Sequence, residues 1–201
     1  INPKAGLTFA AALRSILRQD PNVVMIGEIR DLETASIAFR AAQTGQLVLS
    51  TLHTNTAPGA VIRLLDMGVE SYLVSASLIG VLNQRLVRTI CPHCREFYRA
   101  SPEEVKELSP DLVGQDIRYA RGKGCHRCKG TGFAGRTGLY ELMVMNEEIR
   151  RLTVRNPSVT ALREAARAAG MKTLREDGIC KVISGLTTIG EVIYTTKKED
   201  E

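Results

Sequence analysis

Two Cys-x-x-Cys pairs constrain this chain more than any other feature of its sequence. Cys91 and Cys94 form one pair, Cys125 and Cys128 form the other, and 30 residues separate them. Four thiolates in two such pairs are the usual ligands of a structural, tetrahedral Zn²⁺ site. No secretory signal is evident, which favours a metal over disulfides. The sequence therefore predicts a structural zinc on these four cysteines; the alternative is that the thiols are free.

Three further residues bear on this prediction. His93 and His126 lie inside the two pairs, and because four cysteines already complete a tetrahedron we expect neither histidine to be a ligand. A closed site of this kind leaves no position open for catalysis. Cys180 falls within a helical pattern and is expected to be a small core residue.

The composition narrows the possible functions. The net charge is +5, but aromatic residues make up 4% of the chain and tryptophan is absent. A surface that stacks nucleic-acid bases is therefore not expected. No apolar run reaches the length of a membrane-spanning helix. The chain begins at Ile1 rather than at a methionine, so we expect it to be a fragment of something longer.

Short apolar runs alternate with helical patterns in the first part of the chain. We expect strands at 23–26 and 47–49, and helices at 8–19, 31–43, 57–67 and 72–86. Thr8 and Asp31 are suitable N-caps. This alternation predicts an α/β fold with a parallel sheet whose strands are buried on both faces. Two strands are too few for such a sheet, so we expect further strands before Ile1.

The composition changes at Cys91, where a polar, glycine-rich and cysteine-bearing segment begins. Within this segment the patterns predict one helix, at 103–108, and after it a strand at 139–144 and further helices at 147–154, 157–169 and 173–185. Asn156 is the expected N-cap of the third helix and Thr173 opens a capping box for the fourth. These changes predict three regions: 1–90, 91–138 and 139–201.

Polar residues follow both predicted strands. Glu28 comes just after the first strand, and Thr51 and His53 continue the second. Ligands of open α/β sheets bind at the carboxyl ends of strands, where a carboxylate can hold Mg²⁺ or orient water and a histidine can bond a phosphate. The alternative is structural, with Glu28 and Asp31 merely pairing with Arg30 and capping the next helix. The convergence of two strand ends favours a site.

Several runs of this sequence, including those that contain Glu28, His53 and the cysteine pairs, resemble the C-terminal half of the type II secretion and type IV pilus assembly ATPases. The matching runs cover essentially the whole chain: Gly6–Phe9, Leu13–Pro21, Gly27–Ala35, Leu49–Asn55, Asp66–Gly68, Gln84–Arg88, both cysteine pairs and Gly135–Glu141. One departure is Gln46, where the family's His box usually has histidine. The phosphate-binding sequence Gly-x-x-x-x-Gly-Lys-Ser/Thr does not occur in the 201 residues.

The resemblance implies the C-terminal part of a RecA-like P-loop NTPase core, a four-cysteine zinc subdomain and a small helical C-terminal region. It implies that Glu28 is the Walker B glutamate and His53 the His-box histidine, with Gly27, Arg30 and Thr51 beside the nucleotide. It also implies a hexameric motor, using ATP and Mg²⁺, that drives pilin or pseudopilin assembly.

The same resemblance implies a cytoplasmic location at the inner membrane, an inner-membrane platform protein and other machinery components as partners, and no nucleic acid. With the Walker A expected before Ile1, the chain alone should be inactive. A rival interpretation is a zinc-knuckle binding module without ATPase activity. The run Cys125-x-x-Cys-x-Gly-x-Gly132 resembles zinc-knuckle co-chaperones, and a zinc ribbon that binds nucleic acid is a variant of this alternative.

Overall fold

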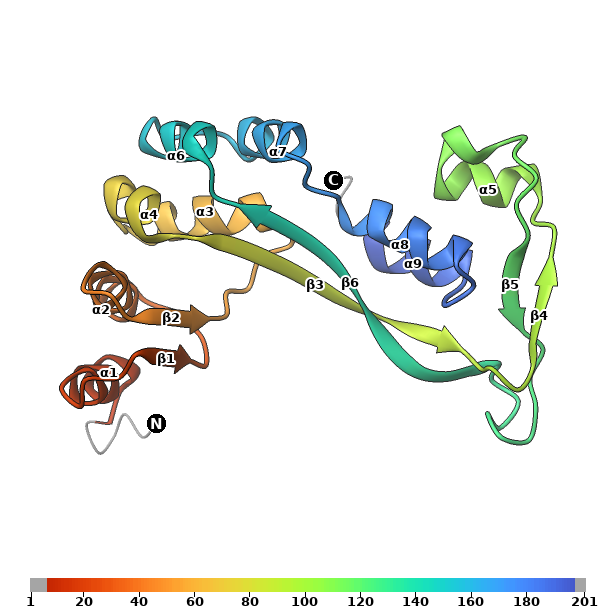
Figure 1. The fold of residues 1–201 in the computed structure, drawn as a ribbon, viewed down its shortest axis with the longest axis horizontal. Helices are drawn as coiled ribbons and strands as arrows, with labels where there is room; N and C mark the ends of the chain where they lie inside the picture. Colours follow the sequence, from red (N-terminus) through yellow and green to blue (C-terminus); the bar gives the residue numbers. More distant parts are fainter. Residues whose placement is uncertain (1–6, 198–201) are drawn as a thin grey trace. The chain divides into compact units, whose positions relative to one another are not determined.

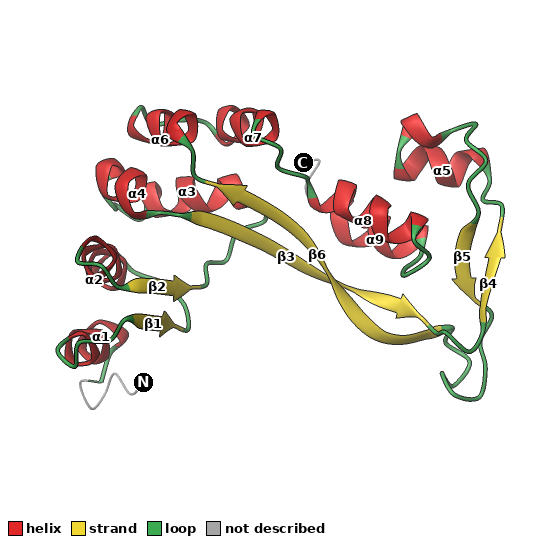
Figure 2. Ribbon diagram, in the orientation of Figure 1, coloured by secondary structure: helices red, strands yellow, loops and turns green. Residues whose placement is uncertain are grey.

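The computed structural model describes residues 7–197, and these form two compact units. Of the described residues, unit 1 comprises 7–81 and Met143–Met171, and unit 2 comprises Leu82–Leu142 and 172–197. Each unit therefore combines segments that are far apart in the sequence. Figures 1 and 2 show the helices and strands of both units.

Unit 1 carries the α/β pattern that the sequence predicts. Its elements are α1 (Phe9–Leu17), β1 (Val23–Ile26), α2 (Leu32–Gln43), β2 (Leu47–Ser50), α3 (Ala57–Asp66), α4 (Ser71–Ser77), α6 (Glu147–Val154) and α7 (Val159–Ala168). Strands β1 and β2 are parallel, with Val23 opposite Leu47 and Ile26 opposite Ser50. The two arrows accordingly point the same way in Figure 1 and end side by side.

Local capping explains where the first helices begin. The Thr8 hydroxyl accepts a hydrogen bond from the Ala11 N–H (3.1 Å) and begins α1. Asp31 Oδ1 accepts from the Thr34 N–H (2.7 Å) and begins α2. Each such cap typically contributes about 1 kcal/mol. Both predicted caps are confirmed, and Asp31 thereby turns the chain directly from the end of β1 into α2.

Only one face of the β1–β2 pair is covered by the described residues. Val24 and Ile26 are buried in the core of unit 1, among residues of α1, α2 and α3. On the opposite face Val23 is 57% exposed and Met25 75% exposed. The prediction that these strands are buried on both faces is therefore wrong for this structure, because helices pack against a single face of the pair.

Unit 2 contains the remaining elements. These are β4 (Arg95–Tyr98), α5 (Pro102–Leu108), the short 3₁₀ turn η2 (Pro110–Leu112), β5 (Tyr119–Gly122), α8 (Leu174–Ile183), α9 (Ile189–Thr196) and most of β3 (Gly80–Ile90) and β6 (Phe133–Val144). Strands β3 and β6 pair with each other, as do β4 and β5. Strands β4 and β5 are antiparallel, with Arg95 opposite Gly122.

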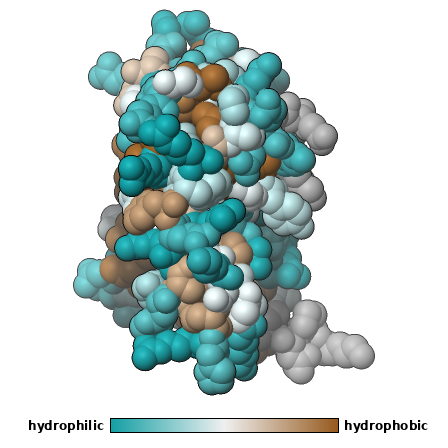
Figure 3. Space-filling view, turned by 90° about the vertical axis from the view of Figure 1, so that its right-hand side faces the viewer, coloured by the Kyte–Doolittle hydropathy of each residue, from teal (hydrophilic) through white to brown (hydrophobic). Residues whose placement is uncertain are grey.

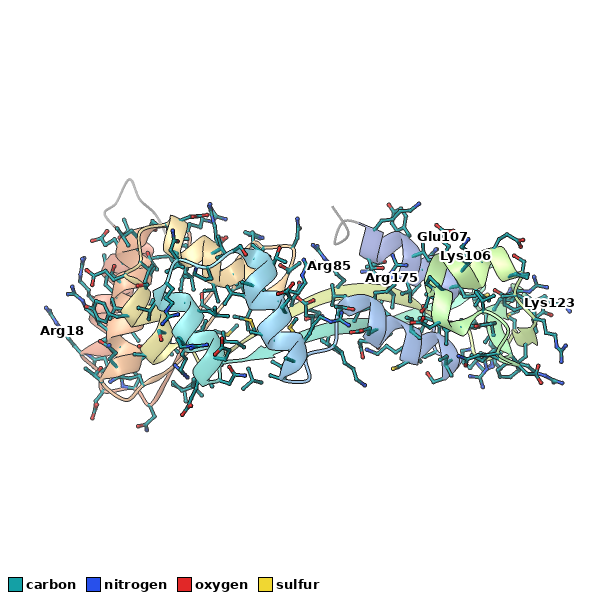
Figure 4. The ribbon with its side chains drawn as sticks, turned by 90° about the horizontal axis from the view of Figure 1, so that it is seen from above. Arg18, Arg85, Lys106, Glu107, Lys123 and Arg175 are labelled. Atoms are coloured by element: carbon teal, nitrogen blue, oxygen red, sulfur yellow. The ribbon has the colours of Figure 1, made fainter. Side chains whose placement is uncertain are left out.

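Side chains from α8 and α9 join the distant segments of unit 2. Arg175 donates to the carbonyl oxygens of Glu107 (3.0 Å) and Leu108 at the end of α5 (Figure 4). Arg88 of β3 forms an ion pair with Glu191 of α9 (2.6 Å).

The surface turned toward the viewer in Figure 3 is mainly hydrophilic, with small separate apolar areas. Among the described residues no helix is both long and apolar enough to cross a membrane.

One predicted helix is in fact part helix and part strand. We expected a helix over 72–86, but α4 ends at Ser77 and β3 begins at Gly80. Burial alternates along β3, with Asn83 and Val87 buried and Leu82 and Leu86 more than half exposed. This period of two is that of a strand, and it is stabilised by pairing with β6 about 50 residues later in the chain.

Smaller differences concern the C-terminal elements. Strand β6 begins at Phe133, six residues before the predicted start, and helix α9 was not predicted. Ser158 rather than Asn156 caps α7, because Asn156 has a positive φ of 54° while the Ser158 hydroxyl accepts from the Ala161 N–H. Cys180 lies on the outer side of α8 and is exposed, so its predicted core position is wrong.

Candidate functional site

The carboxyl ends of β1 and β2 bring Gly27 and Thr51 together. The regular pairing ends with Ile26 opposite Ser50, and two further hydrogen bonds continue it. The Thr51 hydroxyl donates to the Gly27 carbonyl oxygen (2.7 Å), and the Ile29 N–H donates to the Thr51 carbonyl oxygen (3.1 Å). The two strand ends therefore converge as the sequence predicts, and Glu28 lies in the loop that these bonds hold.

Arg30 and His53 contact the two carboxylate oxygens of Glu28. Arg30 Nη2 forms an ion pair with Oε1, and His53 Nε2 lies 3.3 Å from Oε2. Oε2 is shielded from solvent and has no hydrogen-bond partner among the described residues, so the approach of His53 lacks the alignment of a hydrogen bond. A shielded carboxylate oxygen that accepts no hydrogen bond is costly and rare, so the contacts within the described residues leave this atom unexplained.

The surroundings favour the ionised form of Glu28. Hydrogen bonding by the Arg30 guanidinium lowers the pKa of this carboxyl; partial burial acts in the opposite direction, and His53 adds to the lowering. A cation within hydrogen-bond distance stabilises a carboxylate relative to the neutral acid. The side chain of His53 itself is 89% exposed, so its ring is open to a partner from outside this chain segment.

Both interpretations of this segment receive some support from the contacts. The structural one predicted an Arg30 pair and a helix cap at Asp31, and both are present. It leaves two observations without an explanation: the shielded Oε2 of Glu28 that accepts no hydrogen bond, and the exposed His53 beside it. Sequence reasoning did not anticipate that the Thr51 hydroxyl is bonded to a backbone carbonyl.

The four paired cysteines meet in unit 2. Cys91 follows β3, Cys94 precedes β4, and Cys125 and Cys128 follow β5. The antiparallel pairing of β4 with β5, continued by a hydrogen bond from Lys123 N–H to the Cys94 carbonyl oxygen (2.9 Å), places the two pairs against each other.

Backbone contact closes the base of the cysteine cluster. The Cys91 N–H donates to the Gly132 carbonyl oxygen (2.9 Å). A Cβ atom on Gly122 would lie 1.9 Å from that same oxygen, so only glycine allows the two backbone segments to approach this closely. This close approach is one physical reason for the glycine-rich sequence around the second pair.

The sulfur positions fit a tetrahedral metal ion. The four Sγ atoms all lie within 4.8 Å of one another, with Cys91–Cys125 at 4.0 Å, Cys94–Cys128 at 3.8 Å and Cys125–Cys128 at 3.7 Å. Metal–sulfur bonds of about 2.3 Å at tetrahedral angles separate the sulfurs by about 3.8 Å. The group contains neither histidine, and the His93 ring lies beside Arg127 Nη1 instead (2.9 Å).

The environment of the cluster also favours one thiolate. Burial raises the pKa of Cys128, but N–H groups of Cys125 (3.2 Å) and Gly132 (3.3 Å) donate to its sulfur, and the net effect lowers the pKa to about 6. Burial raises the pKa of the neighbouring Cys94 to about 12. Four thiols without a metal cannot all ionise at such short distances, whereas a divalent cation would allow them to do so.

The chain is similar to proteins of known class over almost its whole length. The family model described as "Type II/IV secretion system protein" matches residues 1–194. The type IV pilus assembly ATPase PilB of Thermus thermophilus is 53% identical over 98% of this chain, which is 22% of that protein's length. The type II secretion system ATPase E of Vibrio cholerae is 50% identical over 98% of this chain and 39% of its own length.

Solved structures give the same result. The pilus retraction motor PilT with bound ADP has a TM-score of 0.63 and 30% identity, over 93% of this chain and 43% of that chain. The ATPase DotB of Legionella pneumophila is 23% identical with a TM-score of 0.62, which shows a shared fold. The chain spans less than two fifths of the length of the two curated relatives named above. With 194 of its residues matched by one family model, and with the fold of PilT, the chain belongs to the type II/IV secretion system protein family.

Proposed function

We propose that this chain is the C-terminal part of a hexameric motor that hydrolyses ATP to drive pilin or pseudopilin assembly. Relatives at 50% identity or more carry the names of pilus assembly and secretion ATPases. The single observation that carries the proposal is the Glu28 carboxylate at the carboxyl end of β1, whose Oε2 accepts no hydrogen bond from the described residues and lies 3.3 Å from His53 Nε2.

In the proposed reaction Glu28 orients the attacking water and accepts its proton. The water oxygen bonds to the γ-phosphorus while the bond from that phosphorus to the β–γ bridging oxygen breaks, giving ADP and phosphate. His53 donates a hydrogen bond to a phosphate oxygen, while Gly27 and Arg30 border the nucleotide. Mg²⁺, when bound, would offset the charge of the phosphate oxygens.

We propose that one Zn²⁺ is held by the four paired cysteines, Cys91, Cys94, Cys125 and Cys128. The ion would crosslink the two cysteine pairs and fix the segment between them. Its four thiolate ligands would leave no position for catalysis.

We propose three functional regions: residues 1–90 as the C-terminal part of a RecA-like core, 91–138 as the zinc subdomain and 139–201 as the C-terminal subdomain. The expected partners are further copies of the chain and an inner-membrane platform protein, at the cytoplasmic face of that membrane.

The zinc-knuckle binding module is the weaker proposal. It accounts for the cysteine cluster alone. The family match extends over residues 1–194 and includes both strands of the α/β unit, which the knuckle interpretation leaves unexplained. The strand-end contacts of Glu28 likewise favour the motor.

The purified 201-residue chain is expected to hydrolyse ATP negligibly, whereas the longer protein that contains it turns over. The reason is that phosphoryl transfer depends on a phosphate cradle, and the sequence of that cradle does not occur in the chain. Steady-state phosphate release from both proteins, with Mg²⁺ present and absent, tests this. Turnover by the short chain equal to that of the long protein would contradict the assigned site.

Replacing Arg30 with glutamine in the longer protein should move the acidic limb of its pH–rate profile to higher pH. The guanidinium is the largest cause that lowers the pKa of Glu28, so its loss raises that pKa. The carboxylate needed as a base is then protonated at a higher pH than before. Arg151→Gln is a matched control, because Arg151 likewise lowers the pKa of a glutamate, Glu148, but on α6. An acidic limb that stays in place would contradict a catalytic role for Glu28.

A further inference from the structure

The regular hydrogen-bond register between β1 and β2 is not continued at Glu28. In a parallel pair, a residue donates to the residue before its partner and accepts from the residue after it. Leu47, opposite Val23, follows this rule and donates to the Asn22 carbonyl oxygen (2.9 Å). Continued along the same register, the rule would direct the Glu28 N–H to the Thr51 carbonyl oxygen.

Instead of the Glu28 N–H, the Ile29 N–H donates to the Thr51 carbonyl oxygen (3.1 Å). Relative to that continued register, the chain beyond β1 therefore accommodates one extra residue before the Ile29–Thr51 bond, as in a β-bulge placed directly after the last regular pair. The extra residue is Glu28. Bulges are concentrated next to active sites, where they redirect a side chain, and here the bulge removes the glutamate from the regular alternation of the strand.

The Thr51 side chain completes the bulge. Its hydroxyl donates to the carbonyl oxygen of Gly27 at 2.7 Å, so Thr51 bonds the residue before Glu28 through its side chain and the residue after it through its backbone. A threonine hydroxyl has a single hydrogen. While that hydrogen is bonded to Gly27, Thr51 cannot donate it to a phosphate oxygen.

We propose that Thr51 is a positioning residue, whose hydroxyl holds the bulge at Gly27–Ile29 so that the Glu28 carboxylate is presented between Arg30 and His53. This role replaces the nucleotide contact that the family resemblance implied for Thr51, and it rests on the proposed function. A carboxylate that must orient water is sensitive to displacement, since a shift of about 1 Å can cost about 10²-fold in rate.

The experiment uses the longer ATPase with Thr51→Val and Thr51→Ser. Valine keeps the branched shape and loses the hydroxyl, and serine keeps the hydroxyl. Thr44→Val is the control, because the Thr44 hydroxyl also lies within hydrogen-bond distance of a backbone carbonyl, that of Ala41 (2.9 Å), and of the Gln46 side-chain oxygen (2.7 Å), but at the end of α2. Glu28→Gln is run in parallel as the reference for complete loss of the proposed base.

For Thr51→Val we expect kcat to fall by about 10- to 100-fold while the Kd for ATP changes by less than about twofold. Thr51→Ser should restore most of the turnover, and Thr44→Val should leave it unchanged. Amide hydrogen exchange at Ile29 should accelerate in Thr51→Val, because the bulge loses one of its two bonds. This last readout is independent of activity.

Two results would overturn the positioning role while Glu28→Gln remains inactive. A weakened Kd with unchanged kcat would make Thr51 a nucleotide contact, and unchanged kcat, Kd and exchange would make its hydroxyl idle. If Glu28→Gln itself retains full turnover, the proposed function of this site fails, whatever Thr51 does.

Discussion

Glu28→Gln in the longer protein is expected to lower the rate of ATP hydrolysis by about 10²- to 10⁴-fold while nucleotide binding persists. Glutamine keeps the size of the side chain and loses the charge that accepts a proton from water. On the proposed function, binding persists because the phosphates are held mainly by a cradle outside this segment. Steady-state turnover and equilibrium binding of ATP, measured on the same preparation, test both parts of this expectation.

Two further variants sharpen the test. Glu148→Gln is the matched control, since Glu148 is also paired with an arginine, Arg151 at 2.6 Å, yet lies on α6 away from the strand ends. Its turnover should equal that of the unmodified protein. His53→Ala should reduce turnover less than Glu28→Gln, because it removes one hydrogen bond and leaves the base in place. Near-normal turnover in Glu28→Gln would reduce Glu28 to the structural partner of Arg30.

Cys94→Ser is expected to abolish stoichiometric zinc binding. The unmodified chain, purified under reducing conditions, should carry about one zinc, and the variant much less, because serine replaces a thiolate ligand with a poor one. Elemental analysis measures this directly. The matched control is Cys180→Ser, which changes an exposed cysteine outside the cluster and should keep the full zinc content. Zinc well below one per chain in the unmodified protein would contradict the assigned metal.

The same variant should loosen the zinc segment and spare the α/β unit. The core of unit 1 is built from residues up to Val81 and from Met143 onward, so no residue of 91–138 belongs to it. Metal binding is coupled to local folding of its own segment. Hydrogen exchange should therefore accelerate within 91–138 and stay unchanged in β1 and α2. Equal acceleration in both regions would show that the metal stabilises the whole chain.

Much of the candidate site could be predicted from the sequence, because it depends on local chemistry. Thr8, Asp31 and Thr173 begin helices as expected, since a hydroxyl or carboxylate cap acts within three residues of its own position. The four cysteines converge as their spacing predicts, and the antiparallel pairing of β4 with β5 places the two pairs against each other. Glu28 and His53 meet because parallel strands end at the same edge of a sheet.

The tertiary structure decided what local chemistry leaves open. Residues 80–86 are compatible with a helix, and they form a strand because β6, distant in sequence, pairs with them. The alternating burial of β1, with Val24 and Ile26 inside and Met25 exposed, depends on which face the helices cover. The bulge at Glu28 likewise exists only once Thr51 lies opposite Gly27. The family, the cysteine cluster and the residues at the strand ends were therefore predictable from residue types and spacing alone. Contacts between distant segments, which no local propensity encodes, were needed for β3, for the exposed face of the β1–β2 pair and for the direction of the Glu28 carboxylate.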